Sequence, residues 1–509
     1  MSRRLIEWSL DNRAVVLLLT LLMAGIGLYC LTVLPIDAVP DVTNVQVQIN
    51  TNAPGLAPEE VERFITFPIE QAMTGLPDVT QVRSLSKYGL SQVTVVFEDR
   101  VDIYFARSLV FERLQDARGQ IPEGLGEPEM GPISSGLGEI YQYQVAGEGL
   151  TPQELRTIQD WEVKRQLRTV PGITEVNSFG GQEMQYEVLV DPDLLRARGL
   201  SLRDVFRALA ENNRNAGAGF LEHRDEQYLV RGIGMLRGPE DIGNVVIAEV
   251  RGTPVFVRDV ARVVEGSALR QGAVTRDGKG EIVTGIAMML IHENSRIVAQ
   301  RTDARVREIN ESLPEGVRLE PFYDRTELVN RTIRTVAQNL AEGALLVVVV
   351  LFAILGNFRA SLVVALAIPL SMLFAAILMT RFGISGNLMS LGAIDFGMVV
   401  DGAVVMVENT VRRLSQASGR DVLAVVREAA LEVGKPIVFG VGTIMVVYLP
   451  ILTLTGMEGK MFLPMAWTVV FALGGSLLLA LTTIPVLASL FLKAPRHARP
   501  GAEAEHEGA

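Results

Sequence analysis

Six stretches of the chain are apolar over about twenty residues, the length that a helix needs to cross a bilayer, where no water satisfies an open backbone. They comprise residues 14–34, 339–356, 360–380, 388–407, 436–454 and 462–492. A cleaved signal peptide is a poor interpretation of the first stretch, because it is too long and Pro35, Ile36 and Asp37 follow it in place of a small-residue cleavage site. The pattern therefore predicts six transmembrane helices.

The polar segment between the first and second apolar stretches has a mixed α and β pattern. Positions that alternate with period two, as in half-buried strands, are followed by apolar positions at helical spacing. The predicted strands are residues 42–49, 91–98, 139–145, 175–179, 184–190 and 281–291, and the predicted helices are residues 58–75, 102–118, 151–169 and 296–312. This order predicts at least two small α+β modules of split β-α-β type, with residues 194–273 inserted in the second.

Charge is concentrated in that polar segment. The chain has 509 residues and a formal net charge of −11, and residues 35–337 alone contain 33 Lys and Arg against 45 Asp and Glu. If the N-terminus is cytoplasmic, twelve Lys and Arg lie in short cytoplasmic segments and only Arg381 and Lys460 lie in short segments on the other side. Because positive residues favour the cytoplasmic side, we expect both termini inside and the acidic segment outside.

Composition narrows the chemistry further. The single cysteine, Cys30, rules out an internal disulfide or a cysteine-rich zinc site, and the four histidines are scattered. No phosphate-binding P-loop is present, so ATP is not indicated as the energy source. We find no Ser/His/Asp or Cys/His arrangement and no basic patch that indicates nucleic-acid binding. The sequence therefore indicates no enzyme and no resident cofactor.

Carboxylates in the fourth apolar stretch are the strongest functional signal. Asp395 and Asp401 lie within it and Glu408 closes it. A carboxylate at the bilayer centre costs about 2.5–3.5 kcal/mol and by default marks a proton or ion pathway. Asp401 and Glu408 are seven residues apart and share a helix face, roughly 10 Å apart along the axis, whereas Asp395 points about 120° away from Asp401. We expect these acids to line two sides of a tightly packed helix, and glycines allow that packing: Gly392, Gly397 and Gly402.

The alternative is that these acids form structural ion pairs. The apolar stretches contain no interior Lys or Arg, so the sequence indicates no structural cation for Asp395 or Asp401 within these stretches. Glu408 is the exception, because Arg412 and Arg413 follow it at the spacing of an ion pair on one helix face. For Glu408 the structural and functional interpretations remain equally open.

Several long motifs resemble the heavy-metal branch of the resistance–nodulation–division (RND) efflux pumps. They are LPIDAVPDVTNVQVQINTNAPGLAPEEVE, SLSKYGLSQVTVVFEDRVDIYFAR, PEMGPISSGLGEIYQYQV, PGITEVNSFGGQ and DFGMVVDGAVVMVENTVRRL. The resemblance extends over nearly the whole chain and implies a proton-driven export of metal cations from the periplasm or membrane. It also implies a trimer in the inner membrane of a Gram-negative bacterium, with a periplasmic adaptor protein and an outer-membrane channel as partners. Because the DFGMVVDGAVVMVEN motif matches, the resemblance implies that Asp395, Asp401 and Glu408 form the proton relay.

The resemblance covers only the N-terminal half of such pumps, which have twelve spans and two large periplasmic loops. The relay lysine of the family lies in the other half, so the chain is expected to need a complementary C-terminal half. We accordingly expect four regions. They are residues 1–34, the cytoplasmic N-terminus and first span; residues 35–337, the periplasmic porter modules with a docking-like insertion at 194–273; residues 338–493, spans two to six; and residues 494–509, a cytoplasmic polar tail that reads like a genuine terminus.

The transported ion is expected to be a divalent cation. Zn, Co and Cd accept carboxylate and imidazole ligands, whereas Cu(I) prefers sulfur, and the polar segment is rich in carboxylates. Zinc-type relatives hold a carboxylate site in the cleft between porter modules, and the positions that resemble it are Glu139 and Glu175. Their structural interpretation, as solvated surface residues, remains open. His292 is a weaker candidate, since a lone histidine is more often structural.

Two other functions remain open. The same fold also suits export of organic compounds, which drug sensitivity on deletion would distinguish from a metal-selective defect. Alternatively the chain is a non-transporting interaction or assembly half, or a degenerate gene product, which never associates with a second half.

Overall fold

The computed structural model describes residues 2–37, 39–250, 252–270, 272–392, 396–417 and 420–492. Within these residues, six helices are long and apolar enough to cross a membrane. They are Arg13–Val33, Arg325–Ala353, Phe358–Phe382, Met389–Gln416, Val422–Thr453 and Gly456–Leu481. The number expected from the apolar stretches is confirmed. The chain divides into two compact units, the first comprising Met1–Ile140, Met289–Gln300 and Asp324–Ala509, the second Tyr141–Met288 and Arg301–Tyr323.

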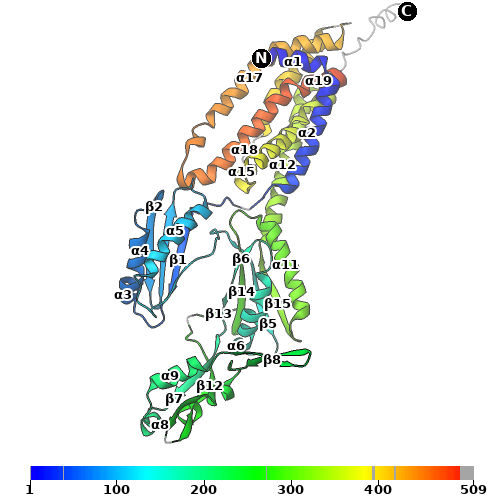
Figure 1. Ribbon diagram of the computed structural model, residues 1–509. Helices are drawn as coiled ribbons and strands as arrows, with labels where there is room; N and C mark the ends of the chain where they lie inside the picture. Colours follow the sequence, from blue (N-terminus) through cyan, green and yellow to red (C-terminus); the bar gives the residue numbers. More distant parts are fainter. Residues whose placement is uncertain are drawn as a thin grey trace, which may run out of the picture. The chain divides into compact units, whose positions relative to one another are not determined.

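The helical part of the first unit consists of two helices before the polar segment and the remaining helices after it (Figure 1). Its helices are α1 (Ser2–Asp11), α2 (Arg13–Val33), α12 (Arg325–Leu355), α13 (Phe358–Ala365), α14 (Ala367–Phe382), α15 (Leu388–Gly392), α16 (Phe396–Gln416), α17 (Val422–Val447), α18 (Gly456–Leu481) and α19 (Thr483–Phe491). Two predicted spans are each divided into two helices. Pro369 and Pro485 explain the breaks at Leu366 and Thr482, because a proline ring clashes with the carbonyl four residues earlier.

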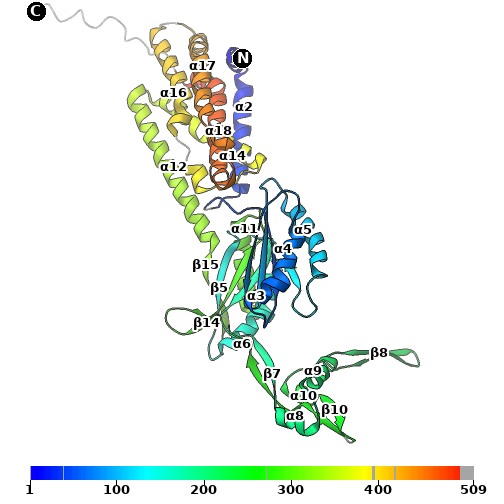
Figure 2. The same cartoon turned by 90° about the vertical axis from the view of Figure 1, so that its left-hand side faces the viewer.

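The first unit also contains the first α+β module. Its elements are β1 (Gln46–Asn52), α3 (Pro58–Val61), a π-helical turn (Glu62–Thr66), α4 (Phe67–Met73), β2 (Val79–Lys87), β3 (Leu90–Phe97), α5 (Ile103–Arg118) and β4 (Pro128–Met130). The strands form one sheet in the order β2-β3-β1-β4, and helices α3, α4 and α5 lie along one side of it (Figure 2). Asp102 begins α5 by accepting hydrogen bonds from the backbone amides of Tyr104 and Phe105, both 3.0 Å long.

A second sheet repeats this topology. Its elements are β5 (Glu139–Gly147), α6 (Pro152–Ile158), a π-helical turn (Gln159–Val163), α7 (Lys164–Leu167), β6 (Ile173–Phe179), β13 (Val274–Thr275), β14 (Glu281–Met289), α11 (Ser295–Ser312) and β15 (Val317–Asp324). The order is β13-β14-β5-β15, and β6 pairs with β14. Both sheets therefore follow the β-α-β-β-α-β order of the split β-α-β type, which is the type of module predicted from the sequence. The strands β2, β4, β13 and β15 were not predicted. The apolar positions of β2 are three residues apart, β4 and β13 have only three and two residues, and the alternation in β15 is limited to its first half.

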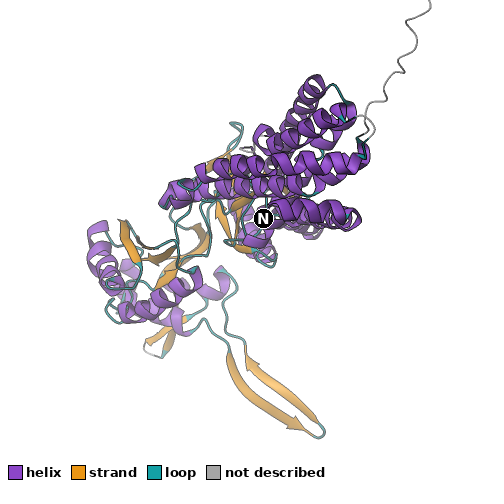
Figure 3. Ribbon diagram, turned by 90° about the horizontal axis from the view of Figure 1, so that it is seen from above, coloured by secondary structure: helices purple, strands orange, loops and turns teal. Residues whose placement is uncertain are grey.

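The segment inserted between β6 and β14 forms smaller structures of its own. They are β7 (Met184–Val190), α8 (Pro192–Arg198), α9 (Leu202–Glu211), β8 (Ala216–His223), β9 (Glu226–Gly232), α10 (Pro239–Gly243), β10 (Val246–Val250), β11 (Thr253–Phe256) and β12 (Ala261–Ser267). The strand predicted at residues 184–190 pairs with β12 and not with the module sheet. The β8–β9 hairpin extends from the rest of this segment as a two-stranded ribbon (Figure 3).

An ion pair joins the chain after α2 to the start of α12. Arg325 is 7% exposed and donates to Asp37 Oδ1 from Nη2 at 2.8 Å and from Nε at 3.1 Å. We expect Arg325→Met to lower the free energy of unfolding by about 3 kcal/mol, because it leaves a largely buried carboxylate without its cation. Thermal unfolding in detergent, followed by labelling of the buried Cys30 thiol, measures this.

The matched control is Arg331→Met. Arg331 pairs with Glu327 on the same helix, but both side chains are exposed. Exposed pairs contribute about 0–1 kcal/mol, so this variant is expected to unfold close to the parent temperature. Equal effects of the two variants would contradict a structural role for the Asp37–Arg325 pair.

Candidate functional site

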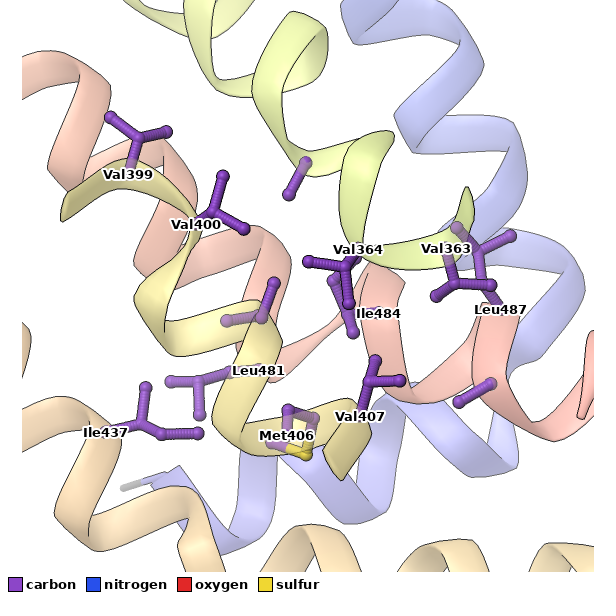
Figure 4. Packing of buried hydrophobic residues seen from close by; sticks show 14 of the residues in the cluster. Val363, Val364, Val399, Val400, Met406, Val407, Ile437, Leu481, Ile484 and Leu487 are labelled. Atoms are coloured by element: carbon purple, nitrogen blue, oxygen red, sulfur yellow. The ribbon is translucent and has the colours of Figure 1, made fainter. Parts of the chain in front are cut away.

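Helix α16 carries two of the candidate acids, Asp401 and Glu408, and packs against six other helices, α12, α13, α14, α17, α18 and α19. Its buried side consists of Val399, Val400, Gly402, Ala403, Met406, Val407, Asn409, Thr410 and Leu414. Figure 4 shows Val399, Val400, Met406 and Val407 in one apolar cluster with side chains of α13, α17, α18 and α19. The labelled neighbours in that cluster are Val363, Val364, Ile437, Leu481, Ile484 and Leu487. This packing fixes the rotation of α16 about its axis.

Asp401 and Glu408 lie on the opposite, exposed side of α16. Both residues are exposed, as is Val405 between them, which is 42% exposed. The expectation that Asp401 and Glu408 share one helix face agrees with this arrangement. The helix therefore buries its apolar side within the chain and presents its carboxylates outward. Asp395, the third predicted acid, lies outside the described residues.

The packed side of α16 approaches its neighbours closely beside Asp401. A Cβ atom added to Gly402 would lie 3.2 Å from Ile437 Cγ2 and 3.4 Å from Ala480 Cβ. The buried Ser476 hydroxyl of α18 donates a hydrogen bond to the Val399 carbonyl, two residues before Asp401. The close approach predicted for glycine at 402 is present, whereas a Cβ atom at Gly392 would meet no atom of the described residues within 4 Å. The Ser476 bond was not predicted, because a serine in an apolar helix usually bonds its own backbone.

The C-terminal end of α16 is held to α17 by polar contacts. Asn409 Nδ2 donates to the Ala429 carbonyl at 3.0 Å and to Glu432 Oε2 at 3.1 Å. Arg413 Nη2 donates to the same Glu432 oxygen at 2.8 Å, and Arg412 Nη2 donates to Asn409 Oδ1 at 2.7 Å. The two arginines that follow Glu408 thus bind Glu432 and Asn409. Among the residues that the structure describes, the ion pair of Glu408 with Arg412 or Arg413, considered from the sequence, does not occur.

The two predicted metal ligands lie on strands. Glu139 is the exposed first residue of β5 and lies on the same face of the strand as Tyr141. The Tyr141 hydroxyl donates a hydrogen bond to Asp303 Oδ1 at 2.9 Å. Glu175 is half-buried in β6, next to the fully buried Val176 and two residues before Asn177. Asn177 Nδ2 lies 3.2 Å from Met288 Sδ, so polar and thioether groups lie on the Glu175 side of β6. No cluster of three His, Cys, Asp or Glu residues suited to a metal occurs within the described residues.

Comparison with known proteins defines the class. A crystal structure of a heavy metal efflux pump matches with a TM-score of 0.86 and 39% identity over 96% of this chain and 48% of that chain. The family model described as the AcrB/AcrD/AcrF family matches residues 5–504. The chain therefore belongs to the AcrB/AcrD/AcrF family, within the RND transporters.

Curated relatives refine this assignment. The cobalt-zinc-cadmium resistance protein CzcA of Cupriavidus metallidurans is 51% identical over 97% of this chain and 48% of its own length. The nickel and cobalt resistance protein CnrA of the same organism is 43% identical over 97% and 49%, and the cation efflux system protein CusA of Escherichia coli K12 is 36% identical over 96% and 48%. The resemblance to heavy-metal efflux proteins is confirmed. The chain spans about half the length of the curated relatives it matches.

Proposed function

We propose that this chain is the inner-membrane permease half of a proton-driven RND system that exports divalent heavy-metal cations of the Zn, Co and Cd kind. The observation that carries the proposal is Asp401, a carboxylate inside an apolar helix of a chain similar to cobalt-, zinc-, cadmium- and nickel-resistance proteins. Each proton that enters along the potential supplies about 2.3 kcal/mol per 100 mV. Six apolar helices support the membrane location, with the acidic segment in the periplasm and both described ends in the cytoplasm.

The proton relay is assigned to Asp395, Asp401 and Glu408. For Asp401 and Glu408 the support is their shared exposed face on a helix whose other side is packed. An ionised carboxylate is costly in the hydrocarbon, and protonation removes that cost, so the charge state of Asp401 changes how α16 prefers to pack. Such a change is the link between proton movement and movement of the cation.

The exposed acidic face of α16 also supports a complementary half as partner. A carboxylate pair at bilayer depth needs a cation or a polar cavity opposite it. We propose that a C-terminal RND half supplies that cation. The working assembly is then a trimer of such paired halves, together with a periplasmic adaptor and an outer-membrane channel.

Glu139 and Glu175 are proposed as metal-ligating residues of this half, with further ligands from elsewhere in the assembly. Carboxylate oxygen suits divalent Zn, Co and Cd. We expect Glu139→Gln and Glu175→Gln each to weaken the apparent affinity for Zn²⁺ by about tenfold or more. The measurement is the Zn²⁺ concentration for half-maximal uptake into inverted vesicles. Glu148→Gln, on an exposed turn, is the control and should match the parent.

Transport itself is tested in vesicles that contain the chain, with and without a complementary half. A pH difference with the periplasmic side of the membrane more acidic is expected to drive Zn²⁺ movement only when both halves are present. A metal-sensitive dye measures this movement. Movement of organic dyes in place of Zn²⁺ would favour the organic-compound alternative. Absence of association and of any transport would favour the non-transporting half.

A further inference from the structure

The first turns of α18 are bound to the first α+β module through one side chain. Lys460 Nζ lies 2.5 Å from Asp99 Oδ1, 2.8 Å from the Thr43 carbonyl oxygen and 3.2 Å from Asn44 Oδ1. These acceptors come from the segment that leads into β1 and from the loop between β3 and α5. We name the four residues, Lys460, Asp99, Thr43 and Asn44, the Lys460 clamp. All belong to the first unit.

The position of Lys460 makes this set of acceptors informative. Lys460 is the fifth residue of α18, beyond the first turn in which the helix dipole acts most strongly, so the dipole gives its ammonium group no compensation for burial. The Lys460 side chain is 18% exposed, so water supplies little of that compensation. The three ammonium protons match the three acceptors, one of which is a carboxylate. The lysine is therefore stabilised by the module and not by its own helix.

The first turns of α18 lack one backbone hydrogen bond of a regular helix. Pro464 lies inside α18 and removes the backbone hydrogen bond that the Lys460 carbonyl would otherwise accept. A cavity of about 550 Å³ lies beside the clamp and is lined by Asp99, Lys460 and Pro464 among others. The module loop and the helix start therefore have room to move relative to each other when the clamp is open.

The same helix contacts α16 beside Asp401. Ser476 donates its hydrogen bond to the Val399 carbonyl, and Ala480 Cβ lies 3.4 Å from a Cβ added at Gly402. Lys460 and Ser476 are separated by roughly 24 Å of helix. Helix α18 thus has one polar attachment near the candidate relay carboxylate and another on the first module.

We propose that α18 carries a change in the charge of Asp401 to the first α+β module, and that Lys460 is the positioning residue that makes the attachment. The inference rests on the proposed proton-driven function and adds to it a route between proton site and module. Packed helices with discrete arrangements transmit such changes, provided that both ends are attached. When Lys460 is removed, the module no longer follows α18.

Hydrogen–deuterium exchange of the full chain in lipid nanodiscs tests this without requiring transport. Asp401→Asn mimics the protonated carboxylate. It is expected to change amide exchange in β1 and in the β3–α5 loop by about fivefold or more, the lower end of measured coupling between sites. In the Lys460→Met background the same Asp401→Asn change is expected to leave these amides unaltered. Arg381→Met, a cation at the end of α14, is the matched control and should preserve the response.

A charge exchange separates coupling from damage to the fold. Lys460→Asp and Asp99→Lys are each expected to abolish the response, and the double variant is expected to restore it. A response that persists in Lys460→Met, or none in Asp401→Asn alone, overturns the inference, as does failure of the double variant to recover. Failure of the proposed function would be seen separately, as absence of pH-driven Zn²⁺ movement by the parent chain with its complementary half.

Discussion

Asp401→Asn is expected to reduce pH-driven Zn²⁺ transport to the level of vesicles without the protein. An amide cannot bind and release a proton near neutral pH, so the contribution of about 2.3 kcal/mol per proton and 100 mV is lost. Insertion should be unaffected or improved, because the substitution removes a carboxylate that costs about 2.5–3.5 kcal/mol at the bilayer centre. Side-chain volume is nearly unchanged on the exposed face of α16, so packing is preserved. The measurements are pH-driven Zn²⁺ movement in vesicles, the metal tolerance of cells and the quantity of chain in the membrane.

The control for Asp401 is Asp421→Asn. Asp421 precedes α17 and makes no side-chain capping hydrogen bond. Asp421→Asn makes the same chemical change outside the predicted relay, so the metal tolerance of cells should remain at the parent level. Parent-level tolerance in Asp401→Asn would remove Asp401 from the relay. Loss of the chain from the membrane in that variant would instead show a structural role.

Gly285→Val is expected to prevent stable folding of the second sheet. A Cβ atom at Gly285 in β14 would lie 2.2 Å from both Cζ and the hydroxyl oxygen of Tyr143. Tyr143 is fully buried and its hydroxyl donates to Gln159 Oε1 at 3.1 Å, so the ring cannot move aside without losing this bond. Burial raises the pKa of the Tyr143 hydroxyl, which keeps it protonated as a donor. Overpacking of a core lowers the free energy of unfolding by about 1–3 kcal/mol, and by more where the neighbouring side chains cannot move aside. We therefore expect Gly285→Val to lower it by at least about 3 kcal/mol.

Limited proteolysis at increasing temperature measures this effect. Cleavage of the second unit should begin at a clearly lower temperature in Gly285→Val than in the parent chain. Gly217→Val is the matched control, because a Cβ atom at Gly217 in β8 meets nothing within 4 Å. Combining Gly285→Ala with Tyr143→Leu should recover part of the stability lost in Gly285→Ala, since the smaller side chain makes room. No recovery would show that the Tyr143 overlap is not the cause.

Local patterns predicted much of the architecture. The strand at residues 91–98 and the helix at 102–118 correspond to β3 and α5, because alternation and helical spacing report directly which side of an element is buried. The helix predicted at 58–75 is interrupted by a π-helical turn at Glu62–Thr66, which no local pattern signals. The last apolar stretch was predicted as one helix, although Pro485 was a signal for the break before α19.

Only part of the candidate site on α16 could be predicted from the sequence. Asp401 was identified because a charge in an apolar stretch is costly wherever its neighbours lie. The partners of Arg412 and Arg413 were not identified, since Glu432 lies on the next helix, nineteen positions after Arg413 in the chain. Spacing along one helix favoured an ion pair with Glu408, but packing of α16 against α17 gave both arginines other acceptors. Glu139 and Glu175 remain predictions from motif resemblance.

The sequence alone determined six apolar spans, the type and the helices of two α+β modules, and the carboxylates of the fourth span, because hydropathy and periodicity are properties of neighbouring residues. Only the tertiary structure decided which side of α16 is packed, which glycines face a neighbour, and what Lys460 binds. Lys460 and Asn44 are separated by 416 positions in the chain, and no local pattern relates them. Such contacts arise when already formed elements pack together, and their geometry depends on every side chain between them.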